Sequence, residues 1–205
     1  MSLRAFFADA PRITVRDALS EFLGASDDGL IEYGYADAVR VAGHSCPTVA
    51  GAYLMALAGL RALYPDATPE RGGIEVVMNG GEDEGTTGVI AQVFTLLTGA
   101  AAANGFHGIG GRFRRHGLLR YGGHLPGFIA SFRRMDSGET VFLDLDVSGV
   151  QPSPGMRMLM GRAMQPDASG EDRRAFAATW QDRVRRILLE HGGDPNVVRV
   201  ARATN

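Results

Sequence analysis

The sequence predicts an α+β fold, and two features of its hydrophobic pattern carry that prediction. Residues 47–63 form a segment that is apolar nearly all round, which is typical of a helix buried in the centre of a protein. Residues 118–121, 127–133 and 140–147 look like strands, and the last of them alternates apolar and polar residues, as a strand with one buried face does. Since these segments follow one another closely, we expect them to pair antiparallel.

The composition sets the class of protein. Of the 205 residues, 45% are hydrophobic and 21% are charged, so the chain can bury an ordinary core. The net charge of −2 and the scattered arginines argue against a nucleic-acid partner. The longest apolar run, residues 49–63, is shorter than the roughly 20 residues that a membrane span needs. With a single cysteine and no signal-like segment in residues 1–10, we expect a cytoplasmic protein.

Three features mark the elements up to the central helix. Residues 14–24 start with an N-cap threonine and an acid three residues later, which predicts a short amphipathic helix. The loose alternation over residues 30–41 predicts one or two strands. Pro47 suits the first position of the central helix, because a proline there lacks only an N–H group that is not needed. Cys46 is therefore expected at or next to the N-cap.

After the central helix, glycine and proline mark where elements stop. Gly99 ends a second apolar helix, and residues 152–155 break the strand pattern before a methionine-rich helix. The glycine-rich residues 99–123 are expected to form a loop. The elements expected here are a strand at 73–79, a helix at about 87–97, strands at 118–121, 127–133 and 140–147, and helices at 156–164 and 172–191.

The segment His44-Ser45-Cys46 is the candidate chemical centre. A thiol at a helix N-terminus feels the positive end of the helix dipole, which favours the thiolate that binds metals. His44 can direct its imidazole to the same point, and one sulfur with one nitrogen ligand suits zinc or another divalent transition metal. From these residues alone, a small buried cysteine beside a turn histidine explains the pattern equally well.

Residues 43–54, Gly-His-Ser-Cys-Pro-Thr-Val-Ala-Gly-Ala-Tyr-Leu, resemble the Gly-His-x-Cys-Pro-Gly segment and following helix of the FmdE-like family, which takes its name from a component of formylmethanofuran dehydrogenase. Residues 97–100, Leu-Thr-Gly-Ala, and the turn after them are similar to that family's Thr-Gly-Cys-Thr segment and Gly-Lys-Gly-Asn turn. The resemblance covers residues 14–147. It implies a twisted, mainly antiparallel sheet packed on the central buried helix. It also implies an FmdE-like domain over residues 1–150, with a C-terminal helical extension over residues 151–205 packed on it.

The chain departs from that family at positions that matter for redox chemistry. Ala100 stands where the family has a second cysteine, and Val89 and Gln92 lie near the positions of the family's cysteine and aspartate. These departures argue against cysteine-pair redox chemistry. His107 falls about where the family's glycine-rich lysine lies, so it is a candidate third metal ligand. A surface turn residue is the alternative for His107.

Two charged clusters are further candidates. Glu82 and Asp83 could supply a general base or an oxygen ligand, although acids before a helix are also favoured by its dipole. The run of Arg112, Arg114 and Arg115 could clamp a carboxylate or phosphate, or lie exposed beside nearby acids. The candidate residues are therefore Cys46, Glu82 and Asp83 for catalysis, Arg112 and Arg114 for binding a cofactor or ligand, and His44, Cys46 and His107 for the metal.

Two functions fit this pattern. In the first, a metal with an open position at His44 and Cys46 polarises a one-carbon or carbonyl-bearing substrate in a pocket floored by residues 47–63. In the second, the chain is a non-enzymatic subunit that holds a metal or cofactor for a larger oxidoreductase. An exposed apolar patch would favour the second. We also expect a homodimer, because the central helix and the methionine-rich segment carry more apolar side chains than one chain comfortably hides.

Overall fold

The computed structural model describes residues 3–203 and confirms the predicted α+β class. The helices and strands are η1 (Ala5–Asp9), β1 (Ile13–Arg16), α1 (Ala18–Phe22), β2 (Leu30–Tyr33), α2 (Tyr35–Ala42), α3 (Pro47–Leu63), β3 (Ile74–Met78), α4 (Thr87–Thr98), β4 (Leu119–Arg120), β5 (Ala130–Arg134), β6 (Thr140–Leu145), α5 (Met156–Ala163), α6 (Gly170–Arg185), η2 (Arg186–Glu190) and β7 (Val198–Arg202). Within residues 3–203, no helix combines the length and apolar character that a bilayer crossing requires.

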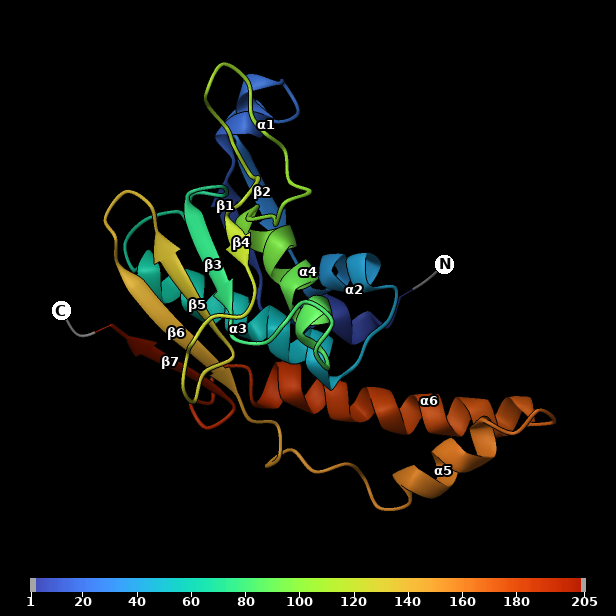
Figure 1. The fold of residues 1–205 in the computed structure, drawn as a ribbon. Helices are drawn as coiled ribbons and strands as arrows, with labels where there is room; N and C mark the ends of the chain where they lie inside the picture. The colour runs from blue at the N-terminus through green and yellow to red at the C-terminus, as the bar shows by residue number, and fades with distance from the viewer. Residues whose placement is uncertain (1–2, 204–205) are drawn as a thin grey trace.

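The main sheet has five strands in the order β4-β3-β5-β6-β7 (Figure 1). It is mainly antiparallel, because β5 pairs antiparallel with both β3 and β6, and β7 pairs antiparallel with β6. Strand β4 runs parallel to β3. A separate two-stranded sheet holds β1 and β2.

Helix α3 is the buried centre of the molecule, with the bounds that the sequence predicted. It packs against β5, β6 and β7 and against α4. Two of its glycines allow this close approach. A Cβ atom on Gly51 would lie 2.2 Å from Leu145 Cδ2, and one on Gly59 would lie 2.9 Å from Phe132 Cδ2. The small residues of α3 therefore set the distance between the helix and the sheet.

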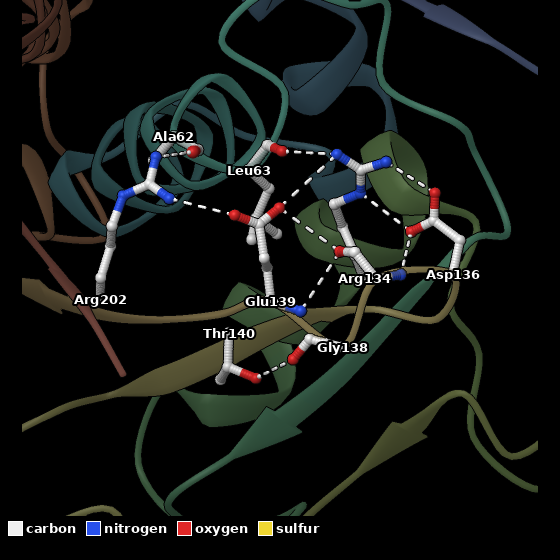
Figure 2. A network of polar contacts seen from close by, with 9 residues as sticks. Ala62, Leu63, Arg134, Asp136, Gly138, Glu139, Thr140 and Arg202 are labelled. Atoms are coloured by element: carbon white, nitrogen blue, oxygen red, sulfur yellow. Dashed lines mark hydrogen bonds and ion pairs between the residues drawn. The ribbon is translucent and has the colours of Figure 1, made fainter. Parts of the chain in front are cut away.

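Arginines hold the C-terminal end of α3 (Figure 2). Arg134 Nη1 donates to the carbonyl of Leu63 at 3.0 Å, and Arg202 Nη2 donates to the carbonyl of Ala62 at 2.6 Å. Glu139 forms ion pairs with both arginines. Positive charge near the last carbonyls of a helix is favoured by the helix dipole. This network ties β5 and β7 to the helix they cover.

The prediction of a helix from residue 14 is wrong at its start. Residues 13–16 form β1, because Ile13 and Val15 alternate into the core while the strand pairs with β2. The helix α1 that follows is short, and Asp17 is its N-cap. Its carboxylate accepts from the backbone N–H of Leu19 at 2.9 Å and of Ser20 at 3.3 Å.

The prediction of strands over residues 30–41 is right only for β2. The rest of that segment forms α2, in which Tyr35, Ala38 and Val39 are buried at helical spacing. Gly43 ends α2 with φ 73°, a left-handed conformation that suits glycine. The chain can then reverse into the His44-Ser45-Cys46 segment.

The C-terminal part is more than a helical extension. Helices α5 and α6 are present and pack on each other, and Figure 1 shows this pair projecting away from the sheet. After α6, the π-helical turn η2 buries Ile187 and Leu188, and β7 joins the edge of the main sheet. Residues after 150 therefore complete the sheet, which the prediction of a purely helical extension missed.

Candidate functional site

The segment His44-Ser45-Cys46 connects α2 to the buried helix α3. Cys46 is the N-cap of α3, with extended backbone at φ −149° and ψ 169°. Its Sγ accepts from the backbone N–H of Val49 at 3.4 Å, and Pro47 occupies the first turn. The N-cap position predicted for Cys46 is therefore confirmed. Cys46 is half-buried, and it is a free thiol.

Ser45 is fixed by residues from α6 and α2. Its hydroxyl donates to Gln181 Oε1 at 3.0 Å and lies 2.9 Å from the hydroxyl of Tyr35. Its carbonyl accepts from Gln181 Nε2 at 3.0 Å and from Trp180 Nε1 at 3.1 Å. Burial raises the pKa of Tyr35, so its hydroxyl remains a donor at neutral pH. Helix α6 thus holds the backbone between His44 and Cys46 in one place.

Within residues 3–203, one ring nitrogen of His44 has a hydrogen-bond partner and the other has none. Nδ1 lies 2.9 Å from the carbonyl of Ala42, and the ring is exposed. Because a carbonyl only accepts hydrogen bonds, Nδ1 carries the proton in this contact, and Nε2 is the ring nitrogen that could bind a metal. Metal-binding histidines are commonly oriented by such a contact at the other nitrogen. His44 and Cys46 are therefore two suitable donors on one anchored segment.

The structure does not bring the third predicted ligand to this segment. His107 is exposed and stacks on His116, with ring centroids 4.3 Å apart. Within residues 3–203, no three or more His, Cys, Asp or Glu residues form a group that could hold a metal ion. Of the three predicted metal ligands, only His44 and Cys46 therefore lie on one segment.

A cavity of about 630 Å³ lies along α4. One face of α4 lines it through Gly88, Ala91, Gln92, Thr95 and Leu96, which are spaced as one side of a helix. No α3 residue lines this cavity, so it is not the pocket expected over residues 47–63, and neither His44 nor Cys46 reaches it.

Only some of the predicted polar residues reach the cavity. Glu82 lines it, and its charge adds to burial in raising the pKa of Tyr121, which also lines it. Asp83 is exposed and lies outside the lining. Arg112 and Arg114 are exposed too, and Arg112 lies over the ring of Phe113 at 4.8 Å instead of facing a ligand site. The arginine that lines the cavity is Arg71, which the sequence pattern did not single out.

Arg71 belongs to a buried charge cluster with Asp17 and Arg115. Arg71 Nη1 donates to Asp17 Oδ2 at 2.6 Å, and Arg115 Nη2 donates to Asp17 Oδ1 at 2.5 Å. The side chain of Asp17 is 4% exposed and that of Arg115 is 10% exposed. Gly72 and Gly99, both at positive φ, leave the space in which the Arg115 guanidinium lies.

Asp17 is ionised in this cluster. Burial alone would raise the pKa of Asp17, but the hydrogen bond from Arg71 and the charges of both arginines outweigh it, so the pKa lies below its usual value. Burial, together with the charge of Arg71, lowers the pKa of Arg115 against the attraction of Asp17. An arginine nevertheless stays protonated in proteins. The cluster therefore holds two positive charges and one negative charge.

Comparison with known proteins adds no relative. No model of a protein family matches the chain. No curated protein shows significant sequence similarity to it. The residues and their geometry therefore carry the functional proposal.

Proposed function

We propose that this protein binds a divalent transition metal ion, such as zinc, through His44 and Cys46 and uses it on a small one-carbon or carbonyl-bearing molecule. The observation that carries the proposal is that His44 and Cys46 lie two residues apart on a segment that α6 fixes, with the His44 ring held through Nδ1 and the Cys46 thiol at the N-cap of α3. The resemblance of residues 43–54 to the FmdE-like family points the same way, and we include membership of that family in the proposal.

The donor set fits a catalytic rather than a structural metal site. Imidazole nitrogen and thiolate sulfur are ligands that zinc prefers. A structural zinc site would have four protein ligands and a catalytic one usually three with an open position, so the pair His44 and Cys46 is closer to the catalytic kind. Two ligands leave open positions, at which a bound metal supplies Lewis-acid polarisation of a carbonyl oxygen. The chain's own contribution is to fix the two donors. The Ala42 carbonyl holds the His44 tautomer, and Gln181 and Trp180 hold the backbone between them.

A subunit role is the second candidate, and one observation favours it. Helix α5 exposes Met158 at 56% and Met160 at 38%, and Met164 beside it is 74% exposed. Flexible methionines at a surface are suited to binding another protein. In the subunit role, the chain is a homodimer or part of a larger oxidoreductase. The free thiol of Cys46 is consistent with a reducing compartment such as the cytoplasm.

Thiol labelling tests the metal site without knowledge of the substrate. Cys46 is the single cysteine, so a thiol reagent reports on this position alone. We expect zinc-loaded protein to be labelled slowly and EDTA-treated protein to be labelled quickly, because a metal-bound sulfur is shielded from attack. His44→Ala should weaken metal affinity by at least about 10–100-fold, the range seen even for lost outer-shell partners, and remove most of the difference.

His107→Ala is the matched control, because His107 stacks on His116 and lies outside the proposed ligand pair. That variant should keep the full effect of chelation. Equal labelling rates with zinc and with EDTA in the wild-type protein would contradict a metal at Cys46. A loss of the difference in His107→Ala would return His107 to the ligand set.

A further inference from the structure

The cavity along α4 has ends of opposite charge. Arg71 lies at the C-terminal end of α4, where its Nε donates to the carbonyl of Leu96 at 3.0 Å. Glu82 lies at the other end, where its backbone carbonyl would be 3.1 Å from a Cβ on Gly88, and the charge of its carboxylate contributes to raising the pKa of Tyr121, which also lines the cavity. The helix face from Gly88 to Leu96 rises by about 12 Å between these ends. A molecule that fills the cavity therefore meets a guanidinium at one end and a carboxylate at the other.

Arg71 keeps hydrogen-bonding capacity for a ligand. Its contacts within residues 3–203 are the carbonyls of Leu96 and Thr95 and the carboxylate of Asp17. A guanidinium has five N–H donors, so these three acceptors leave donors unused. The side chain is 21% exposed and held in position by those contacts, which reduces the entropy lost when an anion binds.

The charge balance behind Arg71 favours an anion at this end. Asp17 neutralises one of the two guanidiniums, and Arg115, with its side chain 10% exposed, leaves a surplus positive charge that water screens poorly. Glu82 in the same cavity disfavours a multiply charged anion such as phosphate. A ligand that carries one carboxylate at one end and a hydrogen-bond donor at the other suits both ends of the cavity.

We propose that the α4 cavity binds a small organic carboxylate, with its carboxylate on Arg71 and a hydroxyl or ammonium group at Glu82. The small side chains of Gly88 and Ala91 leave the room in which the body of the ligand lies. The volume of about 630 Å³ is within the range of small-molecule sites in proteins. The inference goes beyond the metal site and does not depend on it, because neither His44 nor Cys46 lines this cavity.

Calorimetric titration of the full chain with 6-aminohexanoate, hexanoate and inorganic phosphate tests the proposal. We expect 6-aminohexanoate to bind more tightly than hexanoate, and phosphate to bind more weakly than both. Glu82→Gln should remove the preference for the amino group, so that hexanoate, no longer repelled by the Glu82 charge, binds at least as tightly as 6-aminohexanoate; Glu82 is exposed and can be replaced without loss of the fold. Arg71→Lys should weaken all carboxylates by about tenfold or more, since lysine cannot form the two-pronged contact.

Ala91→Leu tests the location independently of the charge cluster. Ala91 lines the cavity, so leucine would fill it while Arg71, Asp17 and Arg115 stay in place. We expect this variant to be folded, as a cooperative unfolding transition in urea would show, and to lose carboxylate binding. Unchanged binding in Ala91→Leu would overturn the site, as would the absence of saturable binding of either carboxylate at millimolar concentrations. Phosphate binding as tight as that of hexanoate would overturn the ligand class. The C46A variant should bind 6-aminohexanoate like the wild type, so failure of the metal site would not be mistaken for failure of this one.

Discussion

Asp17→Asn is expected to lower the free energy of unfolding by about 3–5 kcal/mol, the cost of removing one partner of a buried ion pair. Asparagine keeps the shape of the side chain and an acceptor for the N–H of Leu19, so the helix cap survives. The carboxylate charge is lost, and the buried guanidinium of Arg115 and the half-buried guanidinium of Arg71 then repel each other without compensation. Urea denaturation of both proteins measures the difference.

Glu32→Gln is the control for Asp17→Asn. Glu32 pairs with Arg12 at the surface, where both side chains are 53% exposed. Exposed pairs contribute about 0–1 kcal/mol, so this variant should be close to the wild type. If Asp17→Asn and Glu32→Gln have equally small effects, the Asp17 cluster does not stabilise the fold.

The effect of Asp17→Asn should also depend on pH. The pKa of Asp17 is lowered in the folded protein, so its stabilising contribution is fully present above the unfolded pKa, near 3.9. The contribution is lost as the pH falls from there through the lower folded pKa. The stability difference between wild type and variant should therefore be constant near neutral pH and shrink in acid. A difference that grows in acid would contradict an ionised Asp17.

Gly72→Ala is expected to have the second large effect, because two costs combine. Gly72 has φ +89°, outside the range that alanine readily adopts, which costs about 1–2 kcal/mol. An added Cβ would lie 1.1 Å from Arg115 Nη1, so the guanidinium must leave Asp17. Losing that buried contact adds about 3–5 kcal/mol. Thermal unfolding should therefore show a strongly destabilised or unfolded variant.

Gly24→Ala separates the two costs. Gly24 has a similar φ of +70°, but an added Cβ there would meet nothing within 4 Å. This variant should lose only the backbone contribution of about 1–2 kcal/mol. Equal destabilisation by Gly24→Ala and Gly72→Ala would show that Arg115 does not need the space beside Gly72.

The sequence predicted the elements whose signals are local. The bounds of α3 follow from Pro47 at its start and from an unbroken apolar run, and α4 ends where Gly99 takes a left-handed conformation. The prediction for residues 13–16 was wrong because an N-cap pattern at Thr14 competes with the alternation of Ile13 and Val15. Pairing with β2, a contact made later in the chain, decides in favour of a strand.

The charge cluster could not be predicted because its members are far apart in the chain. Asp17 and Arg71 are separated by 54 positions, and Asp17 and Arg115 by 98. The sequence shows Arg115 next to Arg112 and Arg114, and nothing local distinguishes the buried arginine from its exposed neighbours. The cavity could not be predicted for the same reason, since α4, Arg71 and Tyr121 meet only in the folded chain.

The N-cap position of Cys46 was predictable, whereas the environment of Ser45 was not. Pro47 alone indicates where α3 begins, so Cys46 follows directly. The contacts from Trp180 and Gln181 come from 135 and 136 positions away. The sequence therefore located the two candidate donors, and the fold adds the contacts that hold them.

The most direct test of the proposed function is the metal content of protein purified without added metal. If the proposal is correct, elemental analysis should find about one zinc or other divalent transition metal ion per wild-type chain, because imidazole and thiolate are ligands that zinc prefers. The C46A variant, prepared in the same way, should contain far less while remaining folded, since alanine removes one hydrogen-bond acceptor at the N-cap and little packing. Wild-type protein without metal, or equal metal content in the two proteins, would contradict a metal site at His44 and Cys46.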